Sequence, residues 1–406
     1  MKLIPCRLAG AALVAAVLAS VLPGCGSPSD PPTSPYDAVV IVAGATRNTP
    51  APVFNEHTAQ VTSDVIASGG SVDVVRVSGT PTIVPREELN LRALGGTAAG
   101  NAAVLRRNLD QIEEVMAAGP TADHADYVES ILVAADQVHS LGANDPVLLV
   151  IGSGMSDRGV ADLTGPGMLG ADGAEVVAAA ASTGQLPAND RLDGITVLLS
   201  GTGWTAEPQE PLTDTQRATV TQILADVLTA MGAAVQVDPG PRSGDPVATE
   251  FVVDTVSVPP VGNGQGEDSP SDGPICEPQE IVYDQQSDVR FLPDATQFVD
   301  QARAAAAMDE LVGWLLADPT RRATLRGTTA DDGSPSAQLR EFSLLRAQVV
   351  ADYLVAAGVS PDRLTVEGVG IDFPEYIRPD RDAAGGLLPG PAALNRSVRV
   401  TLTTSC

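Results

Sequence analysis

The sequence has few aromatic residues and almost no lysine. Aromatic residues make up 3% of the 406 residues, while 44% are hydrophobic, so the cores are expected to consist mostly of alanine, valine and leucine. Lys2 is the only lysine, and nearly all of the basic charge is arginine. A chain of this length is long enough for two domains of ordinary size.

Basic charge is also scarce relative to acidic charge. The formal net charge is −27 at pH 7, from 51 acidic and 24 basic residues. Such a balance repels phosphate backbones, which excludes nucleic acid as a partner. It also gives no general attraction to anionic membranes or wall polymers, so any binding to a cell wall must come from a local and specific site.

Side chains that commonly carry catalysis or bind metals are few and scattered. The three histidines, His57, His124 and His139, show no metal-ligand spacing, and His124 and His139 are expected to be surface residues. We find no serine, cysteine or histidine constellation typical of a hydrolase, and the acidic residues are not paired. The sequence therefore predicts neither a catalytic residue, a metal site nor a cofactor.

Residues 1–25 have the pattern of an export signal. Basic residues precede an apolar run that ends at Leu22 and is short for a membrane span. The sequence Leu22-Pro-Gly-Cys25 resembles a lipobox, which implies that Cys25 is acylated and becomes the mature N-terminus. An ordinary signal cleaved nearby is the alternative. Residues 26–35, rich in serine and proline, would form a flexible tether leaving a membrane.

Between residues 36 and 257, strand patterns alternate with helix patterns. Strands are predicted at 38–43, 71–78, 147–151, 195–200 and 234–237, an edge strand at 251–256, and helices at 101–118, 127–141 and 213–231. This order indicates an α/β domain with an open, mostly parallel sheet.

The layout resembles a von Willebrand A-type domain. That family's metal site needs D-x-S-x-S after the first strand, and this chain lacks the motif, so no Mg²⁺ site is expected.

Loops at the carboxyl ends of these strands could line a ligand crevice, as they do in other open α/β sheets. The suggestive segments are 46–48, 152–157 and 201–204. The second segment fits neither a dinucleotide fingerprint nor a nucleophile elbow, because Asp157 and Arg158 stand where glycine is needed. An exported enzyme with a site near Ser156 is therefore the weakest of our functional hypotheses.

Residues 258–276 contain glycine, serine, proline and acids with almost nothing apolar, which predicts a linker before a C-terminal domain at 277–406. Of the four cysteines, Cys276 and Cys406 bracket this domain. In an oxidising compartment they are expected to form a disulfide. Two unpaired terminal thiols are the alternative.

The C-terminal domain is organised around residues 326–370. A Gly-Thr turn at Gly327 is followed by a polar loop, a helix expected to open at about Ser343, and a short strand at 364–367 before a Gly-Val-Gly sequence. The apolar face of that helix is predicted to contain Leu344, Leu345, Val349, Val350, Tyr353 and Leu354. With Asn395-Arg396-Ser-Val398 near the end, this order resembles the OmpA-like peptidoglycan-associated domain over residues 281–402. The resemblance implies an α+β fold of βαβαβ order.

The same resemblance implies a binding site. The family binds the diaminopimelate of the peptidoglycan stem peptide, whose carboxylates suit an arginine and whose ammonium suits an aspartate. Arg346 stands at the family's arginine position, whereas Ala330 replaces its aspartate, so Asp331 is expected to take that place. The remaining site residues would be Thr329, Asn395 and Arg396, and Thr328 and Leu339 replace the family's histidine and asparagine. Arg346 paired only with Asp331 or Glu341, without a ligand, is the alternative.

These features together predict a non-enzymatic, lipid-anchored protein exported to face the cell wall or periplasm. Its C-terminal domain would bind peptidoglycan non-covalently, and its N-terminal domain would be presented to a protein partner. The second hypothesis is an envelope assembly or interaction protein whose OmpA-like domain no longer binds glycan.

Overall fold

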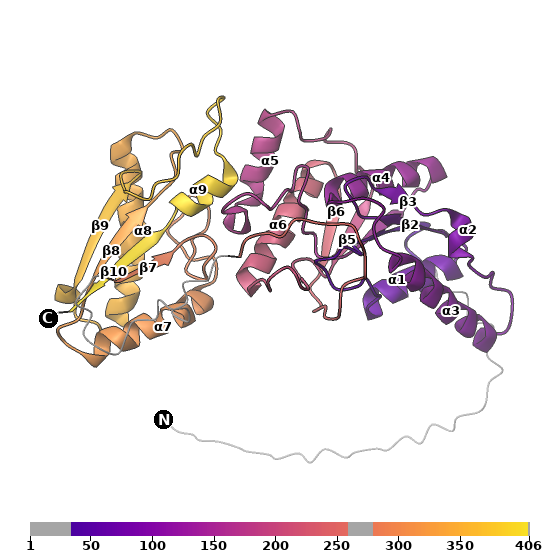
Figure 1. Ribbon diagram of the computed structural model, residues 1–406, viewed down its shortest axis with the longest axis horizontal. Coiled ribbons are helices and arrows are strands. Elements are labelled where there is room, and N and C mark those ends of the chain that lie inside the picture. The colour runs from indigo at the N-terminus through magenta and orange to yellow at the C-terminus, as the bar shows by residue number, and fades with distance from the viewer. Residues whose placement is uncertain (1–33, 259–278, 405–406) are drawn as a thin grey trace, which may run out of the picture.

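The computed structural model describes residues 34–258 and 279–404, which form two separate sheets (Figure 1). One sheet has the strand order β3-β2-β1-β4-β5-β6 and the other β7-β10-β8-β9. The predicted export signal with Cys25, and the predicted pairing of Cys276 with Cys406, lie outside the described residues and stay predictions. None of the helices in the described ranges is both long and apolar enough to cross a membrane.

The N-terminal sheet confirms the predicted open, mostly parallel α/β architecture. Its elements are β1 (Ala38–Ala43), α1 (Glu56–Ala67), β2 (Ser71–Arg76), β3 (Thr82–Ile83), α2 (Arg86–Leu89), α3 (Ala98–Met116), α4 (Tyr127–Leu141), β4 (Pro146–Ile151), η1 (Met168–Gly170), α5 (Gly173–Ser182), β5 (Thr196–Ser200), α6 (Asp214–Ala230) and β6 (Ala234–Asp238). β1 pairs in parallel with both β2 and β4, and only the short β3 is antiparallel.

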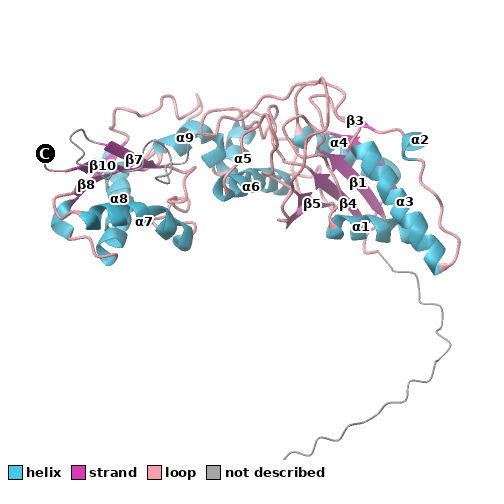
Figure 2. Cartoon of the chain, turned by 60° about the horizontal axis from the view of Figure 1, so that its bottom comes forward, coloured by secondary structure: helices cyan, strands magenta, loops and turns pink. Residues whose placement is uncertain are grey.

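Helices cover both faces of this sheet. Every residue of β1 is apolar and buried, as is typical of a strand covered on both sides. Val40 and Val42 pack in one core with α4, α5 and α6. Val39 and Ile41 point the other way and pack in a second core with α1 and α3. The two layers of helices are visible on either side of the strands in Figure 2.

The predicted edge strand at 251–256 is wrong. This segment forms no sheet ladder, and side chains satisfy its backbone instead. Asp123 accepts from the Val252 N–H at 2.7 Å, and Gln209 both accepts from the Val256 N–H at 2.7 Å and donates to its carbonyl at 2.9 Å. Val253 and Val256 are buried in the core, which explains why the segment has the apolar alternation of a strand.

The C-terminal sheet lies against helices on one face. Its elements are β7 (Gln279–Tyr283), α7 (Gln301–Ala317), β8 (Arg322–Thr328), α8 (Ser336–Ala356), η2 (Pro361–Arg363), β9 (Leu364–Gly370), α9 (Pro389–Asn395) and β10 (Val398–Thr403). β10 runs antiparallel to β7 and β8, while β8 and β9 are parallel. Leu325 and Val400 from the strands pack with Leu311 of α7 and Leu354 of α8, so this part has its own core.

Helix α8 differs from its prediction in start and in face. It begins at Ser336 rather than at about Ser343, and Leu344 and Leu345 are 39% and 49% exposed. The buried face consists of Leu339, Ser343, Arg346, Ala347, Val350, Ala351 and Leu354. A Cβ at Gly327 would collide with the Ser343 carbonyl, so the helix backbone rests directly on β8. This close approach, rather than apolar content alone, selects the inward face.

Candidate functional site

Arg346 lies beneath the segment that follows β7. Its side chain donates from Nε to the Ala295 carbonyl at 3.0 Å and from Nη2 to the Leu292 carbonyl at 3.3 Å. The guanidinium also lies over the Phe342 and Phe291 rings, 4.5 Å and 5.2 Å from their centroids. The residue is only 4% exposed, and no ion pair joins it to a carboxylate within the described residues.

Charges of both signs act on Arg346. Burial, followed by the positive charge of the neighbouring Arg396, lowers the pKa of Arg346 to about 10, and the negative charge of Asp294 offsets this in part. A buried cation with only neutral acceptors is costly, because nothing fully replaces its hydration. Arg346 can therefore accept a carboxylate as a stronger partner than the two carbonyls that it holds.

Arg396 already has a carboxylate partner. It forms a two-pronged ion pair with Glu175 in the first turn of α5, through Nη1–Oε2 at 2.9 Å and a second contact between Nη2 and Oε1. Burial alone would lower the pKa of Arg396, but the hydrogen bonds and charge of Glu175 outweigh this and raise it. The predicted site residue thus joins the two parts of the chain.

Asp331 does not reach Arg346. Its Oδ1 accepts from the Gly333 N–H at 2.9 Å, and Arg381 Nη1 lies 3.7 Å away. Ala330, at the family's aspartate position, is 2% exposed. The structure therefore keeps Asp331 within its own loop and supplies no acidic side chain from Ala330 or Asp331 beside the buried guanidinium.

Asn395 belongs to a structural network around Asp380, a buried residue that the sequence analysis did not single out, while Thr329 bonds to the end of β9. Asp380 Oδ2 accepts from the Asp331 N–H at 2.9 Å, from the Tyr376 hydroxyl at 2.6 Å and from Asn395 Nδ2 at 3.0 Å. The Thr329 N–H donates to the Gly370 carbonyl at 3.0 Å. These contacts fix the loop before α9, and no residue spacing in the sequence signals them.

The crevice between β1 and β4 is filled by Tyr127, the first residue of α4. A Cβ at either Gly44 or Gly152 would collide with its hydroxyl, which is buried beside Ser153 and Gly154 and makes no hydrogen bond of good geometry in the described part of the chain. Ser156 is 1% exposed, and its Oγ accepts from the Tyr127 N–H at 3.1 Å. The geometry thus gives no support to a nucleophile at Ser156.

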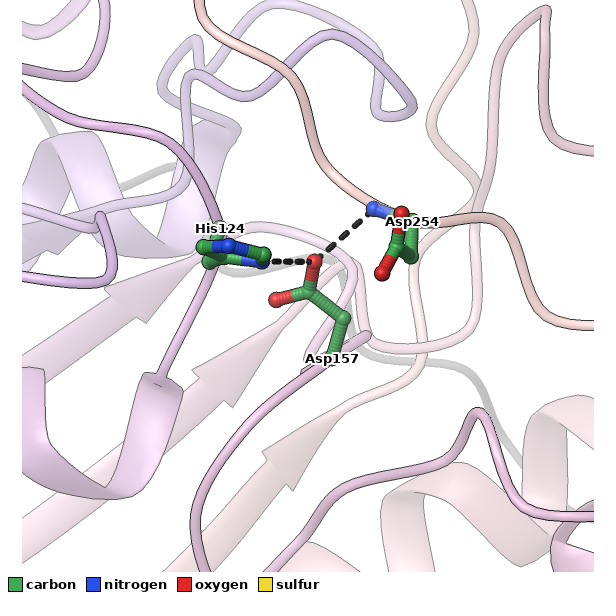
Figure 3. A group of neighbouring side chains, drawn as sticks. All are labelled: His124, Asp157 and Asp254. Carbon is green, nitrogen blue, oxygen red and sulfur yellow. Dashed lines mark hydrogen bonds and ion pairs between the residues drawn. The ribbon is translucent and has the colours of Figure 1, made fainter.

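His124, Asp157 and Asp254 meet at the edge of this crevice (Figure 3). Asp157 Oδ2 lies 3.0 Å from His124 Nδ1 and accepts from the Asp254 N–H at 2.8 Å, while Oδ1 accepts from the Ala125 N–H at 2.7 Å. The prediction of His124 as a plain surface residue is wrong, because its side chain is 31% exposed and paired with a carboxylate that is 1% exposed. Since both Asp157 oxygens already accept hydrogen bonds from the protein, Asp157 ties three segments together.

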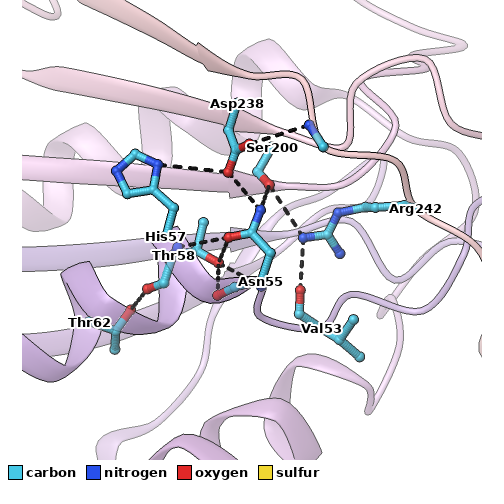
Figure 4. Close-up of polar contacts among 9 residues, drawn as sticks. Val53, Asn55, His57, Thr58, Thr62, Ser200, Asp238 and Arg242 are labelled. Atoms are coloured by element: carbon cyan, nitrogen blue, oxygen red, sulfur yellow. Dashed lines mark hydrogen bonds and ion pairs between the residues drawn. The ribbon is translucent and has the colours of Figure 1, made fainter.

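A second polar group joins the ends of β5 and β6 to α1 (Figure 4). Asn55 Nδ2 donates to Asp238 Oδ2 at 2.6 Å and to Ser200 Oγ at 3.2 Å, and Arg242 Nη2 donates to the Val53 carbonyl at 2.8 Å. Burial lowers the pKa of Arg242. An open cleft of about 670 Å³ borders Arg242 and Trp204. These contacts tie the carboxyl edge of the sheet to α1, while Arg242 Nε and Nη1 are buried without a hydrogen-bond partner in the described residues.

Residues 290–379, which include Arg346, match the OmpA family. The chain carries an OmpA family domain. This confirms the resemblance on which the sequence analysis relied. Among curated proteins, none matches the chain. The resemblance of residues 36–257 to a von Willebrand A-type domain is not shown.

Solved structures similar to this chain come from several bacteria. A MotB-like protein of Desulfovibrio vulgaris is 24% identical over 32% of this chain and 76% of that chain, with a TM-score of 0.25. The cell wall anchor of the type VI secretion system from Pseudomonas aeruginosa is 20% identical over 32% and 82%, with a TM-score of 0.25. The peptidoglycan-associated lipoprotein from Burkholderia pseudomallei is 21% identical over 30% and 89%, with a TM-score of 0.22.

Proposed function

We propose that the chain is a non-enzymatic cell-envelope protein, anchored by lipid at Cys25, which binds peptidoglycan non-covalently through its OmpA-like domain. The observation that carries this proposal is Arg346, a buried guanidinium inside the matched family segment that has only carbonyl oxygens as partners. A stem-peptide carboxylate would replace these neutral acceptors with a charged, two-pronged one. The site would face the cell wall or periplasm.

A second candidate function follows from the missing aspartate. Ala330 is buried where the family pattern has its acid, and Asp331 is engaged in its own loop, so a ligand ammonium would lack an acidic partner from either residue. Losing a charged hydrogen bond of this kind weakens binding by about 1.5–3 kcal/mol. An envelope interaction protein that no longer holds glycan is the function that this observation favours.

Co-sedimentation with isolated peptidoglycan tests the proposal. Residues 26–406 should sediment with the wall polymer, and Arg346→Ala should lower retention about tenfold or more, because a charged hydrogen-bond partner is lost. Arg346→Lys keeps the charge without the planar fork and should also weaken retention, which guards against a variant that simply misfolds. Arg340→Ala, on the exposed side of the same helix, is the matched control and should bind as the parent does.

The outcomes separate the two candidates. Retention that survives Arg346→Ala would remove Arg346 from the site. A parent chain that stays in the supernatant would favour the interaction protein over the wall anchor.

A further inference from the structure

The N-terminal and OmpA-like domains share a polar contact surface beside the arginine site. The surface of the N-terminal domain comes from η1, α5 and α6, and α5 lies beside α9 in Figures 1 and 2. Besides the Glu175–Arg396 pair, Arg290 Nη1 donates to Thr219 Oγ1 at 2.9 Å and Ser182 Oγ donates to Asp382 Oδ2 at 3.1 Å. We call these contacts the interdomain surface.

Backbones approach closely across this surface. A Cβ on Gly390 in α9 would collide with the Pro166 carbonyl oxygen. A Cβ on Gly170 in η1 would lie 2.8 Å from the Gln286 side chain and 2.9 Å from the Gln285 backbone. Since a side chain as small as alanine would not fit at either place, the two domains meet in one defined arrangement and not through loose charge attraction alone.

The chemistry at the centre of the surface is that of the proposed ligand. Glu175 offers Arg396 a carboxylate in a two-pronged pair. Arg290, which donates to Thr219, lies in the same segment as Leu292 and Ala295, whose carbonyls hold Arg346. The N-terminal domain therefore contacts the segment that covers Arg346, and a carboxylate from the chain itself already occupies Arg396. Both members of the pair are mostly buried, with side chains 17% and 21% exposed.

We propose that the N-terminal domain is an intramolecular partner of the wall-binding surface and competes with the stem peptide for it. In the docked arrangement Glu175 holds Arg396, and η1 and α5 lie against α9. Peptidoglycan then binds to the fraction of molecules in which the domains have separated. This inference rests on the proposed function, because it describes how that same site is regulated.

The expected size of the effect follows from the population of separated molecules. The apparent affinity equals the intrinsic affinity multiplied by the fraction of molecules that can bind. If about nine-tenths of the molecules are docked, wall binding is therefore about tenfold weaker. A substitution that raises the population of molecules with separated domains by a given factor should raise retention on peptidoglycan by up to the same factor. The reciprocal also holds, since a ligand that binds only the separated form must pull the domains apart.

Two variants of residues 26–406 test this coupling by different routes. Glu175→Gln removes the competing charge. Gly390→Ala introduces a clash with Pro166 that exists only in the docked arrangement, while within α9 itself alanine is a better helix residue than glycine. Glu129→Gln is the matched control, because Glu129 also lies in the first turn of a helix but is exposed.

Two readouts are needed, namely sedimentation with isolated peptidoglycan and the radius of gyration from small-angle scattering. We expect Glu175→Gln and Gly390→Ala to raise retention severalfold, up to about tenfold, and Gly390→Ala to enlarge the radius of gyration without any wall polymer present. Glu129→Gln should change neither quantity.

Each other result has a definite meaning. If Arg346→Ala abolishes retention but Glu175→Gln and Gly390→Ala leave it unchanged, the wall anchor stands and the competition is overturned, leaving a purely structural contact. If Glu175→Gln lowers retention, Glu175 assists the ligand and the proposal is again overturned. If neither the parent nor any variant sediments, the proposed function itself fails, and the inference fails with it.

Discussion

The carboxyl edge of the N-terminal sheet and the arginine site of the OmpA-like domain differ in how their polar groups are satisfied. At the first, Tyr127 fills the crevice between β1 and β4, and Asp157 accepts hydrogen bonds from three protein donors. At the second, Arg346 is equally buried but faces only carbonyl oxygens and aromatic rings. Asp157 thus has protein donors at both of its oxygens, whereas Arg346 donates to two neutral carbonyls, as Arg242 at the edge of the N-terminal sheet does to one.

This difference separates a structural carboxylate from the arginine of the proposed site. A buried carboxylate with three donors is part of the scaffold, and removing it should cost stability. A buried guanidinium whose hydrogen-bond acceptors are all neutral, and which Asp294 compensates only in part, destabilises the fold, so removing it should cost function instead. The expected effects of single substitutions on the free energy of unfolding therefore run in opposite directions at the two places.

The largest expected effect is at Asp157. Asp157→Ala should lower the free energy of unfolding by about 3–5 kcal/mol, because it leaves the buried N–H of Ala125 and the N–H of Asp254 without their acceptor and removes the partner of His124. Urea denaturation followed by circular dichroism measures this. Asp254→Ala is the control, since its bond to Asp157 comes from the backbone, and it should cost less than about 1 kcal/mol. Equal losses in the two variants would contradict a scaffold role for Asp157.

A smaller effect of either sign is expected from the two arginines of the OmpA-like domain. Arg346→Met should leave the free energy of unfolding unchanged or raise it by about 1 kcal/mol, because an apolar side chain replaces a buried cation that forms no ion pair within 4.0 Å in the described residues. Arg396→Met leaves Glu175 unpaired and should lower the free energy of unfolding by about 1–2 kcal/mol. The loss is this small because the ion pair is partly exposed to solvent. Denaturation midpoints of the two variants give the comparison. A loss above about 2 kcal/mol in Arg346→Met would mean that this guanidinium serves the fold.

Much of the fold can be predicted from the sequence where apolar patterns and helix-capping residues agree. The apolar run of β1 predicts a buried strand with its observed bounds, and α4 runs from Tyr127 to Leu141 as predicted because Asp126 caps its start and Gly142 adopts the left-handed conformation at its end. The sequence analysis does not predict helix α1. Its buried positions include Thr58 and Thr62, so it has no continuous apolar face. Its capping box at Asn55 is a weaker helix signal than such a face.

The sequence predicts the positions of the two arginines of the candidate site but not their contacts. The motif spacing identifies Arg346 and Arg396, because the family pattern fixes both positions, but it does not show what each side chain contacts. Glu175 lies 221 residues before Arg396, and no local pattern connects them. Asp331 was assigned by proximity in sequence, whereas its contacts depend on how the loop carrying Asp380 and Arg381 folds over it. Partners that come from distant segments follow from tertiary packing, which residue spacing does not encode.

The smallest expected effect is the most direct test of the closed crevice. The Tyr127 hydroxyl is buried between Gly44 and Gly152 and makes no hydrogen bond of good geometry in the described residues. Burial raises its pKa, and the adjacent donors of Ser153 and Gly154 offset this in part. Tyr127→Phe keeps the ring and removes only a hydroxyl with poorly aligned partners, so the free energy of unfolding should stay within about 1 kcal/mol of the parent. Gly44→Ala, which keeps the hydroxyl and removes its space, should instead lower it by about 1–3 kcal/mol. A clear loss of stability in Tyr127→Phe would show that the hydroxyl has a partner, and the crevice would then have to be considered a polar site rather than a filled one.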